Sequence, residues 1–357
     1  MKTRIEGLRE ILRDNGHDAY ISLAAPINQY LTGFTGTTSA TIVTQEETLF
    51  LCDFRYTEQA AAQVRSFEVS EVKGGLPLRL GERLTELRAR TAVFEPGYMS
   101  VAERESIAKA FRGTLVSDAG MTAPLRTVKS AREIEAIRQA LKLSEAVLAE
   151  VLEMLEPGIT ELDVAAALEY GFKKRGASGP SFDTIALFGA RSSLPHGMPS
   201  DRALADGDIV LLDFGCRLHG YCSDLTRTCA FGTIPGIWFE EIHETVLSAQ
   251  RQALEAVKPG MTCMELDAVA RDHIAAAGYA KFFGHGLGHG LGIEIHEAPR
   301  LNAESETVLQ PGIVVTIEPG IYLPGQGGVR IEDVIAITDT GCEILSSAPK
   351  RLKVMTA

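Results

Sequence analysis

The second part of the chain contains two copies of one sequence pattern, and this internal repeat limits the folds that the chain can adopt. The segment Pro-Gly-Ile-Thr at 157–160 recurs as Pro-Gly-Met-Thr at 259–262, and each copy opens a helical pattern. The apolar run that leads into a carboxylate at 209–215 recurs at 314–320. A repeated supersecondary unit buries its apolar face against its neighbour. The sequence therefore predicts two helix-plus-hairpin units that face each other.

Length and charge restrict the possible partners. With 357 residues the chain is long enough for two domains that each bury a core. Acidic residues outnumber basic ones by 47 to 35, and the net charge of −12 disfavours nucleic acid as a partner. The N-terminus has no apolar signal segment, no run of residues reaches the length of a membrane span, and the six cysteines lack Cys-x-x-Cys spacing. We expect a cytoplasmic protein that does not bind membranes.

Residues 1–122 alternate helical and strand patterns, which predicts an α/β domain. We expect helices at 4–15, 56–64 and 101–111, and strands at 19–23, 40–52, 92–94 and 115–117. The pattern breaks at 121–124, before a long helix for which Ser130 is the N-cap and Glu133 completes a capping box. The sequence therefore predicts a second, α+β domain over 123–357.

Four carboxylates stand at matching places in the two repeats. Asp213 and Glu318 each end an apolar strand, and Asp224 and Glu332 lie on the strands that follow. A turn near Gly220 predicts that Asp213 lies directly opposite Asp224, where cross-strand Cβ atoms are about 4.5–5.5 Å apart. Carboxylates this close within a sheet require a counter-charge. The four acids therefore predict a site for divalent cations.

A glycine-rich segment at 284–296 carries His285, His289 and His296. Glycine at alternate positions makes a helix unfavourable and favours extended backbone that approaches a ligand closely. Because four residues of strand span about 13 Å, His285 and His289 cannot share one ion. One of them is expected to bind metal and the other to meet substrate. Four carboxylates with one imidazole suit two divalent ions of manganese, cobalt or zinc.

Together these motifs resemble those of the Xaa-Pro peptidases, the prolidase and aminopeptidase P branch of the pita-bread metallopeptidases. The resemblance covers essentially the whole chain. It implies a creatinase/prolidase-like N-terminal domain over 1–122 and a pita-bread catalytic domain with a pseudo-twofold duplication over 123–357. It also implies five ligands for a dinuclear metal centre: Asp213, Asp224, His289, Glu318 and Glu332.

The same resemblance implies roles beyond metal binding. His196, His285 and His296 match the histidines on the substrate side, Glu318 matches the general base, and Arg330 matches an arginine beside the last glutamate ligand. Tyr322 matches a tyrosine near the active site. Members of the branch act on proline-containing di- or oligopeptides and are commonly homodimers, so we expect both properties here.

The residues leave the choice between a dipeptidase and an aminopeptidase open. The compact length favours an Xaa-Pro dipeptidase, and the alternative is an aminopeptidase P that releases the residue before proline from longer peptides. A dipeptidase needs a cation for the carboxylate of the terminal proline. Arg300, a histidine, or Arg55 from the N-terminal domain of a partner subunit are the candidates.

Three other functional interpretations fit the sequence less well. Methionine aminopeptidases share the ligand pattern but generally lack such an N-terminal domain. Creatinase has both domains, works without metal and lacks these ligands. A non-catalytic peptide-binding scaffold is disfavoured because all five ligand positions are present.

Overall fold

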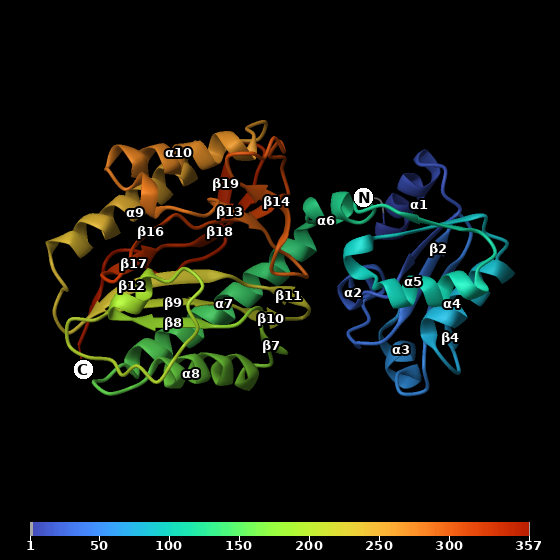
Figure 1. Ribbon diagram of the computed structural model, residues 1–357, viewed down its shortest axis with the longest axis horizontal. Coiled ribbons are helices and arrows are strands. Elements are labelled where there is room, and N and C mark those ends of the chain that lie inside the picture. The colour runs from blue at the N-terminus through green and yellow to red at the C-terminus, as the bar shows by residue number, and fades with distance from the viewer. Residues whose placement is uncertain (1–2, 357) are drawn as a thin grey trace. The chain divides into compact units, whose positions relative to one another are not determined.

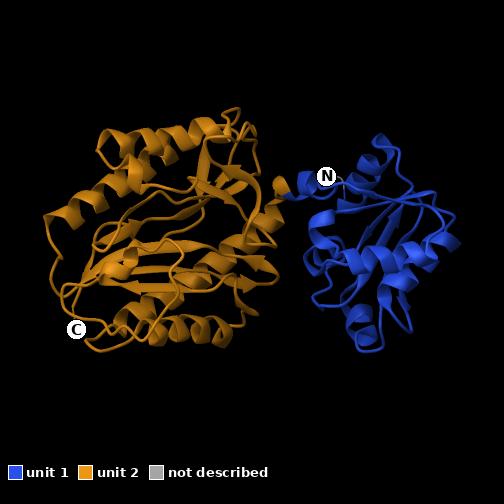
Figure 2. Cartoon of the chain, viewed as in Figure 1, with its two compact units in different colours: residues 1–126 blue, residues 127–357 orange. Residues whose placement is uncertain are grey.

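The computed structural model describes residues 3–356 and divides into two compact units, Met1–Arg126 and Thr127–Ala357 (Figures 1 and 2). The expected domain boundary, after Thr122, lies at the start of helix α6 (Ala123–Thr127). None of the helices in residues 3–356 is both long enough and apolar enough to cross a bilayer.

The first unit is built on a mixed sheet with the strand order β4-β3-β2-β1-β5-β6. Its strands are β1 (Ala19–Ser22), β2 (Ala40–Thr44), β3 (Thr48–Cys52), β4 (Glu68–Glu71), β5 (Thr91–Phe94) and β6 (Thr114–Ser117). Its other helices are α1 (Arg4–Asp14), α2 (Ala25–Thr32), α3 (Thr57–Gln63), α4 (Leu76–Glu86), α5 (Val101–Ala110) and the short η1 (Pro96–Tyr98). Leu80 and Leu84 of α4 and Ile107 of α5 pack against Ile21 and Ile42 of the sheet. The predicted α/β class is confirmed.

Two local predictions for this unit were wrong. The single strand expected at 40–52 is a hairpin, in which β2 and β3 pair with Val43 opposite Thr48. The polar residues at 45–47 form its turn, since they would have no partners inside a buried strand. Helices α2 and α4 were not expected, although each carries a proline in its first turn, where the missing N–H costs nothing.

The second unit consists of two similar halves. The first half contains α7 (Ala131–Glu153), α8 (Glu161–Lys174) and a sheet of β8 (Ile185–Phe188), β9 (Ile209–Phe214), β12 (Leu225–Phe231) and β20 (Val354–Met355). The second half contains α9 (Ile237–Ala256), α10 (Cys263–Ala276) and a sheet of β13 (Gly288–Gly290), β14 (Glu297–Leu301), β15 (Val314–Ile317), β18 (Asp333–Ile337) and β19 (Cys342–Ile344). Shorter elements complete it: β7 (Gly179–Pro180), β10 (Cys216–Leu218), β11 (Tyr221–Cys222), β16 (Gly320–Leu323), β17 (Gly327–Arg330), η2 (Gly189–Ser193) and η3 (Ala280–Phe282).

Each helix pair covers the sheet of its own half (Figure 1). In the first half, Val147 of α7 and Leu168 of α8 share a core with Phe188 and Leu212. In the second half, residues of α9 and α10 share a core with β15 and β18. The sheets therefore lie between the two helical layers. In each half, the apolar residues next to the acidic residues belong to the core of that half.

The repeated turn before α8 and α10 confirms the duplication that the sequence predicts. Thr160 and Thr262 are the N-caps of the two helices, and each forms a capping box with the residue three positions later. Gly158 and Gly260 have φ of 96° and 90°, a left-handed conformation that favours glycine. The capping box of Ser130 and Glu133 at the start of α7 is also as predicted.

Candidate active site

The first acidic hairpin brings Asp213 and Asp224 together, but in a different register from the one expected. Asp213 pairs with Thr226, and Phe214 pairs with Leu225. The prediction of a direct Asp213–Asp224 pair was therefore wrong by two residues. The reason is a two-residue turn at His219 and Gly220, both with positive φ (51° and 84°), which sets Leu218 opposite Tyr221.

The second hairpin places its two glutamates directly across from each other. Strands β15 and β18 pair Ile317 with Asp333, and β16 and β17 pair Gly320 with Arg330. Continuing this register past the end of each ladder sets Glu318 opposite Glu332. The repeat therefore places a carboxylate at corresponding strand ends in both halves, while the pairing around it differs.

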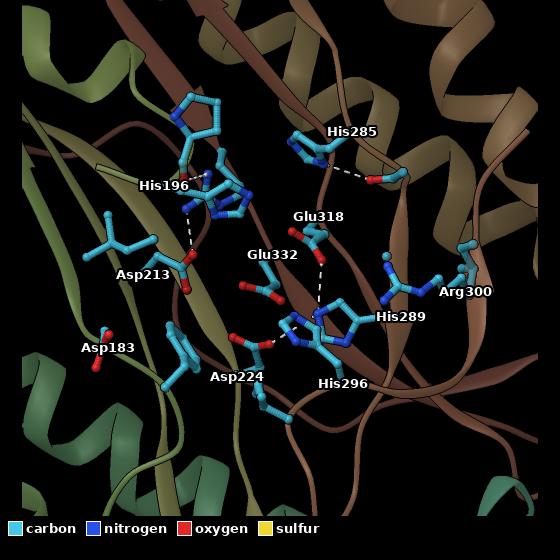
Figure 3. Close-up of a pocket in the computed structure, with 18 of the residues that line it drawn as sticks. Asp183, His196, Asp213, Asp224, His285, His289, His296, Arg300, Glu318 and Glu332 are labelled. Atoms are coloured by element: carbon cyan, nitrogen blue, oxygen red, sulfur yellow. Dashed lines mark hydrogen bonds and ion pairs between the residues drawn. The ribbon is translucent and has the colours of Figure 1, made fainter. Parts of the chain in front are cut away.

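All five candidate metal ligands converge on one point (Figure 3). Asp213, Asp224 and Glu332 each offer an oxygen within 4.8 Å of the others. His289 lies on β13, the one part of the segment 284–296 that forms a strand, so the extended backbone expected there is confirmed only for 288–290. Its Nε2 lies 3.6 Å from Asp224 Oδ2 and 3.4 Å from Glu318 Oε1. Nδ1 of this ring is 3.1 Å from Gly290 O and must donate to it, so Nε2 presents a lone pair to the cluster.

The electrostatics of the cluster are those of a cation site. Burial, followed by the neighbouring carboxylates, raises the pKa of Asp224 and of Glu332 well above the ordinary range. Burial raises the pKa of Glu318 to about 7. Among residues 3–356, Asp213 Oδ1 is a buried oxygen that accepts no hydrogen bond. Divalent cations would satisfy this oxygen and offset the repulsion, so the donor set fits the metals that the sequence predicts.

Arg330 connects the cluster to the rest of the site. Its guanidinium donates to Asp213 Oδ2 at 2.5 Å, to Thr226 Oγ1 at 3.1 Å and to Tyr322 Oη at 2.7 Å. Thr226 in turn donates to Glu332 Oε2 at 2.7 Å. Arg330 therefore fixes one ligand directly and, through Thr226, fixes a second.

Two threonines of the site were not predicted. Thr226 supports Glu332, and Thr316 donates to Glu318 Oε1 at 3.0 Å and accepts from the His289 amide at 3.0 Å. Each lies two residues from a carboxylate on the same stretch of strand. Because side chains two apart share a face of a strand, period-two spacing around Asp224 and Glu318 was the signal that could have found them.

The substrate-side histidines line the same cavity, whose volume is about 510 Å³. His196, His285 and His296 contribute to its wall, as does Arg300 (Figure 3). The rings of His289 and His296 lie 4.4 Å apart. Nε2 of His285 lies 2.9 Å from Tyr322 Oη, and it takes no place in the carboxylate cluster. Nε2 of His289 instead faces Asp224 and Glu318, so the two imidazoles have different partners.

Comparisons with known proteins match both units. The family model described as metallopeptidase family M24 matches residues 135–339, and the one described as the creatinase/prolidase N-terminal domain matches 4–128. The chain belongs to metallopeptidase family M24. The α/β first unit is thereby the creatinase/prolidase N-terminal domain, and the duplicated second unit is the pita-bread catalytic domain that the sequence predicts. The chain is a metallopeptidase.

Similar proteins of this M24 family include both specificities considered above. The Xaa-Pro dipeptidase of Pyrococcus furiosus is 38% identical over 359 residues, covering 99% of this chain and 100% of that protein. Among solved structures, an Xaa-Pro dipeptidase from Bacillus anthracis has a TM-score of 0.95 at 38% identity, covering 98% of this chain and 99% of the other. An X-Pro aminopeptidase from Thermotoga maritima has a TM-score of 0.89 at 38% identity, covering 96% and 98%. Similarity alone therefore does not choose between them.

Proposed function

We propose that the chain hydrolyses the Xaa-Pro peptide bond with two divalent metal ions, and that its preferred substrates are dipeptides. The observation that carries the proposal is the convergence of Asp213, Asp224, His289, Glu318 and Glu332 at the base of one cavity. Two metal ions held by these side chains would supply Lewis acidity toward the scissile carbonyl and the attacking water. Manganese, cobalt and zinc are the candidates.

Glu318 is the proposed general base. Burial raises its pKa to about 7 in the metal-free protein, and bound cations would favour its ionised form, which can accept a proton. Thr316 holds one of its oxygens, and the other is oriented toward the cavity residues drawn in Figure 3. In this role Glu318 accepts the proton of the attacking water and delivers it to the imino nitrogen of the departing proline.

The histidines and Arg330 are proposed to orient the substrate and to stabilise charge on the carbonyl oxygen. His196 and His296 are exposed at the cavity wall, so their ring nitrogens are accessible to a peptide. Proline has no N–H and a fixed φ, so a peptidase that grips an extended backbone amide loses a contact at this residue. A cavity lined by imidazoles and by the apolar side chains of Phe182 and Ile185 accepts such a ring without that contact.

Arg300 is the residue proposed to bind the substrate carboxylate. It pairs across β13 and β14 with His289, is exposed, and lines the cavity. Its cation therefore lies on the strand next to that of a candidate metal ligand, at the wall of the same cavity. This placement favours the dipeptidase over the aminopeptidase. We also propose a homodimer, on the resemblance alone.

Hydrolysis of Ala-Pro and Ala-Pro-Ala by the manganese-loaded protein tests the proposal, with Ala-Ala as the control without proline. We expect rapid cleavage of Ala-Pro and little cleavage of the other two. Rapid cleavage of Ala-Pro-Ala with inert Ala-Pro would establish the aminopeptidase instead. If the metal-loaded protein cleaves neither proline peptide, the proposal is wrong. Glu318→Gln, which keeps the side-chain shape, distinguishes intrinsic activity from a contaminant.

The Arg300→Met variant tests specifically whether Arg300 binds the substrate carboxylate. It is expected to raise KM for Ala-Pro by about tenfold to a hundredfold, the value of one charge-assisted pair. It should leave KM for Ala-Pro amide within about twofold, because that substrate carries no carboxylate. An equal change for both substrates would assign the carboxylate to another group.

A further inference from the structure

Among the buried carboxylates that lie outside the metal cluster, two in the catalytic unit are each paired with an arginine that also holds a segment carrying a substrate-side histidine. Asp267 lies on α10 and is 1% exposed, and Glu161 begins α8 and is 0% exposed. A carboxylate buried this deeply is stable only when its oxygens are paired and hydrogen-bonded. The other hydrogen bonds of each acid–arginine pair show which segment of the chain the pair holds in place.

The Asp267–Arg271 pair holds the segment that carries His285. Arg271 Nε and Nη2 donate to the two oxygens of Asp267 at 2.7 and 2.9 Å. The same Nη2 donates to the carbonyl of His285 at 2.8 Å, and Nη1 donates to the carbonyl of Phe283 at 3.2 Å. Asp267 Oδ1 accepts from the Leu287 amide at 2.9 Å. The pair therefore binds the backbone before, at and after His285.

The ring of His285 is held by the same group of residues. The Arg271 guanidinium carbon lies 4.4 Å from the centre of the Phe283 ring, and that ring packs edge-on against His285 at 5.1 Å and 89°. Residues 283–287 form no helix or strand, and glycines flank His285 on both sides. Local backbone preference cannot fix such a segment, so these contacts, together with the hydrogen bonds of the ring to Tyr322 and Gly286, set the direction of the imidazole.

The Glu161–Arg191 pair holds the segment that carries His196 in the same manner. Glu161 accepts from Arg191 Nε at 2.9 and 3.0 Å, from the Phe188 amide at 2.8 Å and from the Ser200 amide at 2.9 Å. Arg191 Nη2 donates to the carbonyl of Met198, two residues after His196, at 2.6 Å. The pair thus closes the segment 188–200 at both ends. His196 itself is exposed at the cavity wall.

We propose that these two acid–arginine pairs are positioning residues for the substrate-side histidines. Asp267–Arg271 sets His285, and Glu161–Arg191 sets His196, each from its own half of the duplicated unit (Figure 3 shows both histidines). In the described residues, the side-chain hydrogen bonds of the two pairs go to the segments 283–287 and 188–200 and to none of the five candidate metal ligands. The pairs therefore act directly on the segments that carry the substrate-side histidines.

The two pairs do not occupy equivalent repeat positions. The N-caps Thr160 and Thr262 occupy corresponding positions of the two repeats. Counted from these caps, Glu161 is the first residue of α8, whereas Asp267 lies a full turn inside α10. Arg271 is four residues after its partner on one helix, while Arg191 comes from η2. The two halves thus use different residues for the same purpose, which allows each histidine to be perturbed separately.

The experiment uses conservative variants and records the imidazole ¹⁵N signals of metal-free protein labelled at histidine. Arg271→Lys and Asp267→Asn test the first pair, and Arg191→Lys and Glu161→Gln test the second. Lysine keeps the charge but cannot reproduce the guanidinium fork. The matched control is Arg251→Lys, an exposed arginine on α9. His285→Gln and His196→Gln assign the two signals.

We expect Arg271→Lys and Asp267→Asn to move the His285 signal and leave that of His196, and the second pair of variants to do the reverse. All four should retain the metal content of the parent protein. Each should reduce kcat for Ala-Pro about tenfold to a hundredfold, with a smaller change in KM, and Arg251→Lys should change neither. The proposal is overturned if the variants leave both signals in place, move both equally, or lose metal in proportion to activity.

The activity readout rests on the proposed function, but the imidazole signals and the metal content do not. If the parent protein cleaved no Xaa-Pro peptide while the two signals responded selectively, the proposed function would fail and the positioning role would stand. If a variant did not fold, the second variant of the same pair would decide, since each pair is tested from both sides.

Discussion

The hydroxyl oxygen of Tyr322 lies 2.9 Å from Nε2 of His285 and accepts a hydrogen bond from Arg330 at 2.7 Å. Because the arginine can only donate, the phenolic proton is directed toward His285 Nε2. Nδ1 of the same ring lies 2.8 Å from Gly286 O and therefore carries the ring proton. His285 is neutral in this arrangement, in agreement with burial that lowers its pKa to about 4. The metal cluster and the substrate-side histidine are thus joined through Tyr322.

Tyr322→Phe is expected to reduce kcat/KM for Ala-Pro about tenfold to a hundredfold, while the metal content stays the same. The variant removes the acceptor of Arg330 and the donor to His285, and keeps the aromatic ring and its packing. Steady-state kinetics with metal analysis of the same samples checks this. Tyr170→Phe, at an exposed position on α8, is the control. An unchanged kcat/KM in Tyr322→Phe would show that the link has no role in turnover.

Glycine is required at 288 and not at 284. A Cβ at Gly288 would lie 2.1 Å from Thr316 O and 2.7 Å from Thr316 Oγ1, whereas a Cβ at Gly284 would meet nothing within 4 Å. Since Thr316 hydrogen-bonds both His289 and Glu318, Gly288→Ala must displace two candidate ligands. We expect at least about a hundredfold loss of activity with reduced metal affinity, against about a twofold change for Gly284→Ala. Equal activities in the two variants would contradict this prediction.

Much of the fold and of the acidic site could be predicted from the sequence, because repeats and helix caps are local signals. The Pro-Gly-x-Thr turns before α8 and α10 follow from residue type alone, and the same repeat located the acidic strand ends. The register of the first hairpin was not accessible in the same way. It depends on whether Leu218 or His219 opens the turn, and the positive φ of His219 decides this only in the folded chain.

Partners that come from distant segments explain the other omissions. In the sequence, the acids paired with Arg271 and Arg191 look like ordinary helix residues. Their role becomes visible only in the folded chain, where the two arginines donate to carbonyls of distant segments. Thr226 and Thr316 were detectable in principle, from their spacing to the carboxylates. Helix α2 has only eight residues, but α4 has eleven, as many as α1, which was predicted. The proline in the first turn of both helices was the start signal that could have found them.

The stability of the catalytic unit should depend on Arg227 more than on Lys350, although both contact Asp333. Arg227 is 8% exposed and donates to Asp333 Oδ1 at 2.9 Å, to the carbonyl of Glu332 and to the carbonyls of Ala348 and Pro349. The Lys350 side chain is 21% exposed and reaches Asp333 Oδ2 alone, at 2.6 Å. Arg227→Met should lower the free energy of unfolding by about 3–5 kcal/mol, because it breaks a buried pair. Lys350→Met should lower it by about 1 kcal/mol.

Urea unfolding followed by tryptophan fluorescence checks this prediction. Trp238 is the only tryptophan of the chain and lies on α9, so the signal reports the catalytic unit. The metal affinity of Arg227→Met should also fall, because its guanidinium holds the backbone of Glu332. Equal destabilisation in the two variants would show that the ion pair with Asp333, rather than the hydrogen bonds of Arg227 to backbone carbonyls, determines the loss of stability.

Metal binding should release more protons at pH 6 than at pH 8. In the metal-free protein the pKa of Glu318 is about 7, and the pKa values of Asp224 and Glu332 are raised well above the ordinary range. These carboxyls must ionise before they bind a cation, so each proton that they hold at the working pH is released. Burial lowers the pKa of His289 to about 4, so this ligand is already neutral and contributes no proton between pH 6 and 8.

Titration calorimetry with manganese in two buffers of different ionisation enthalpy measures the number of protons released. The number should rise, and the apparent affinity should fall, as the pH is lowered from 8 to 6 through the pKa of Glu318. In Glu318→Gln the release at pH 6 should drop by nearly one proton, with little change at pH 8, where Glu318 of the parent protein is already ionised. A proton release that is the same at both pH values would mean that Glu318 does not titrate between pH 6 and pH 8 in the metal-free site, and the prediction would be wrong.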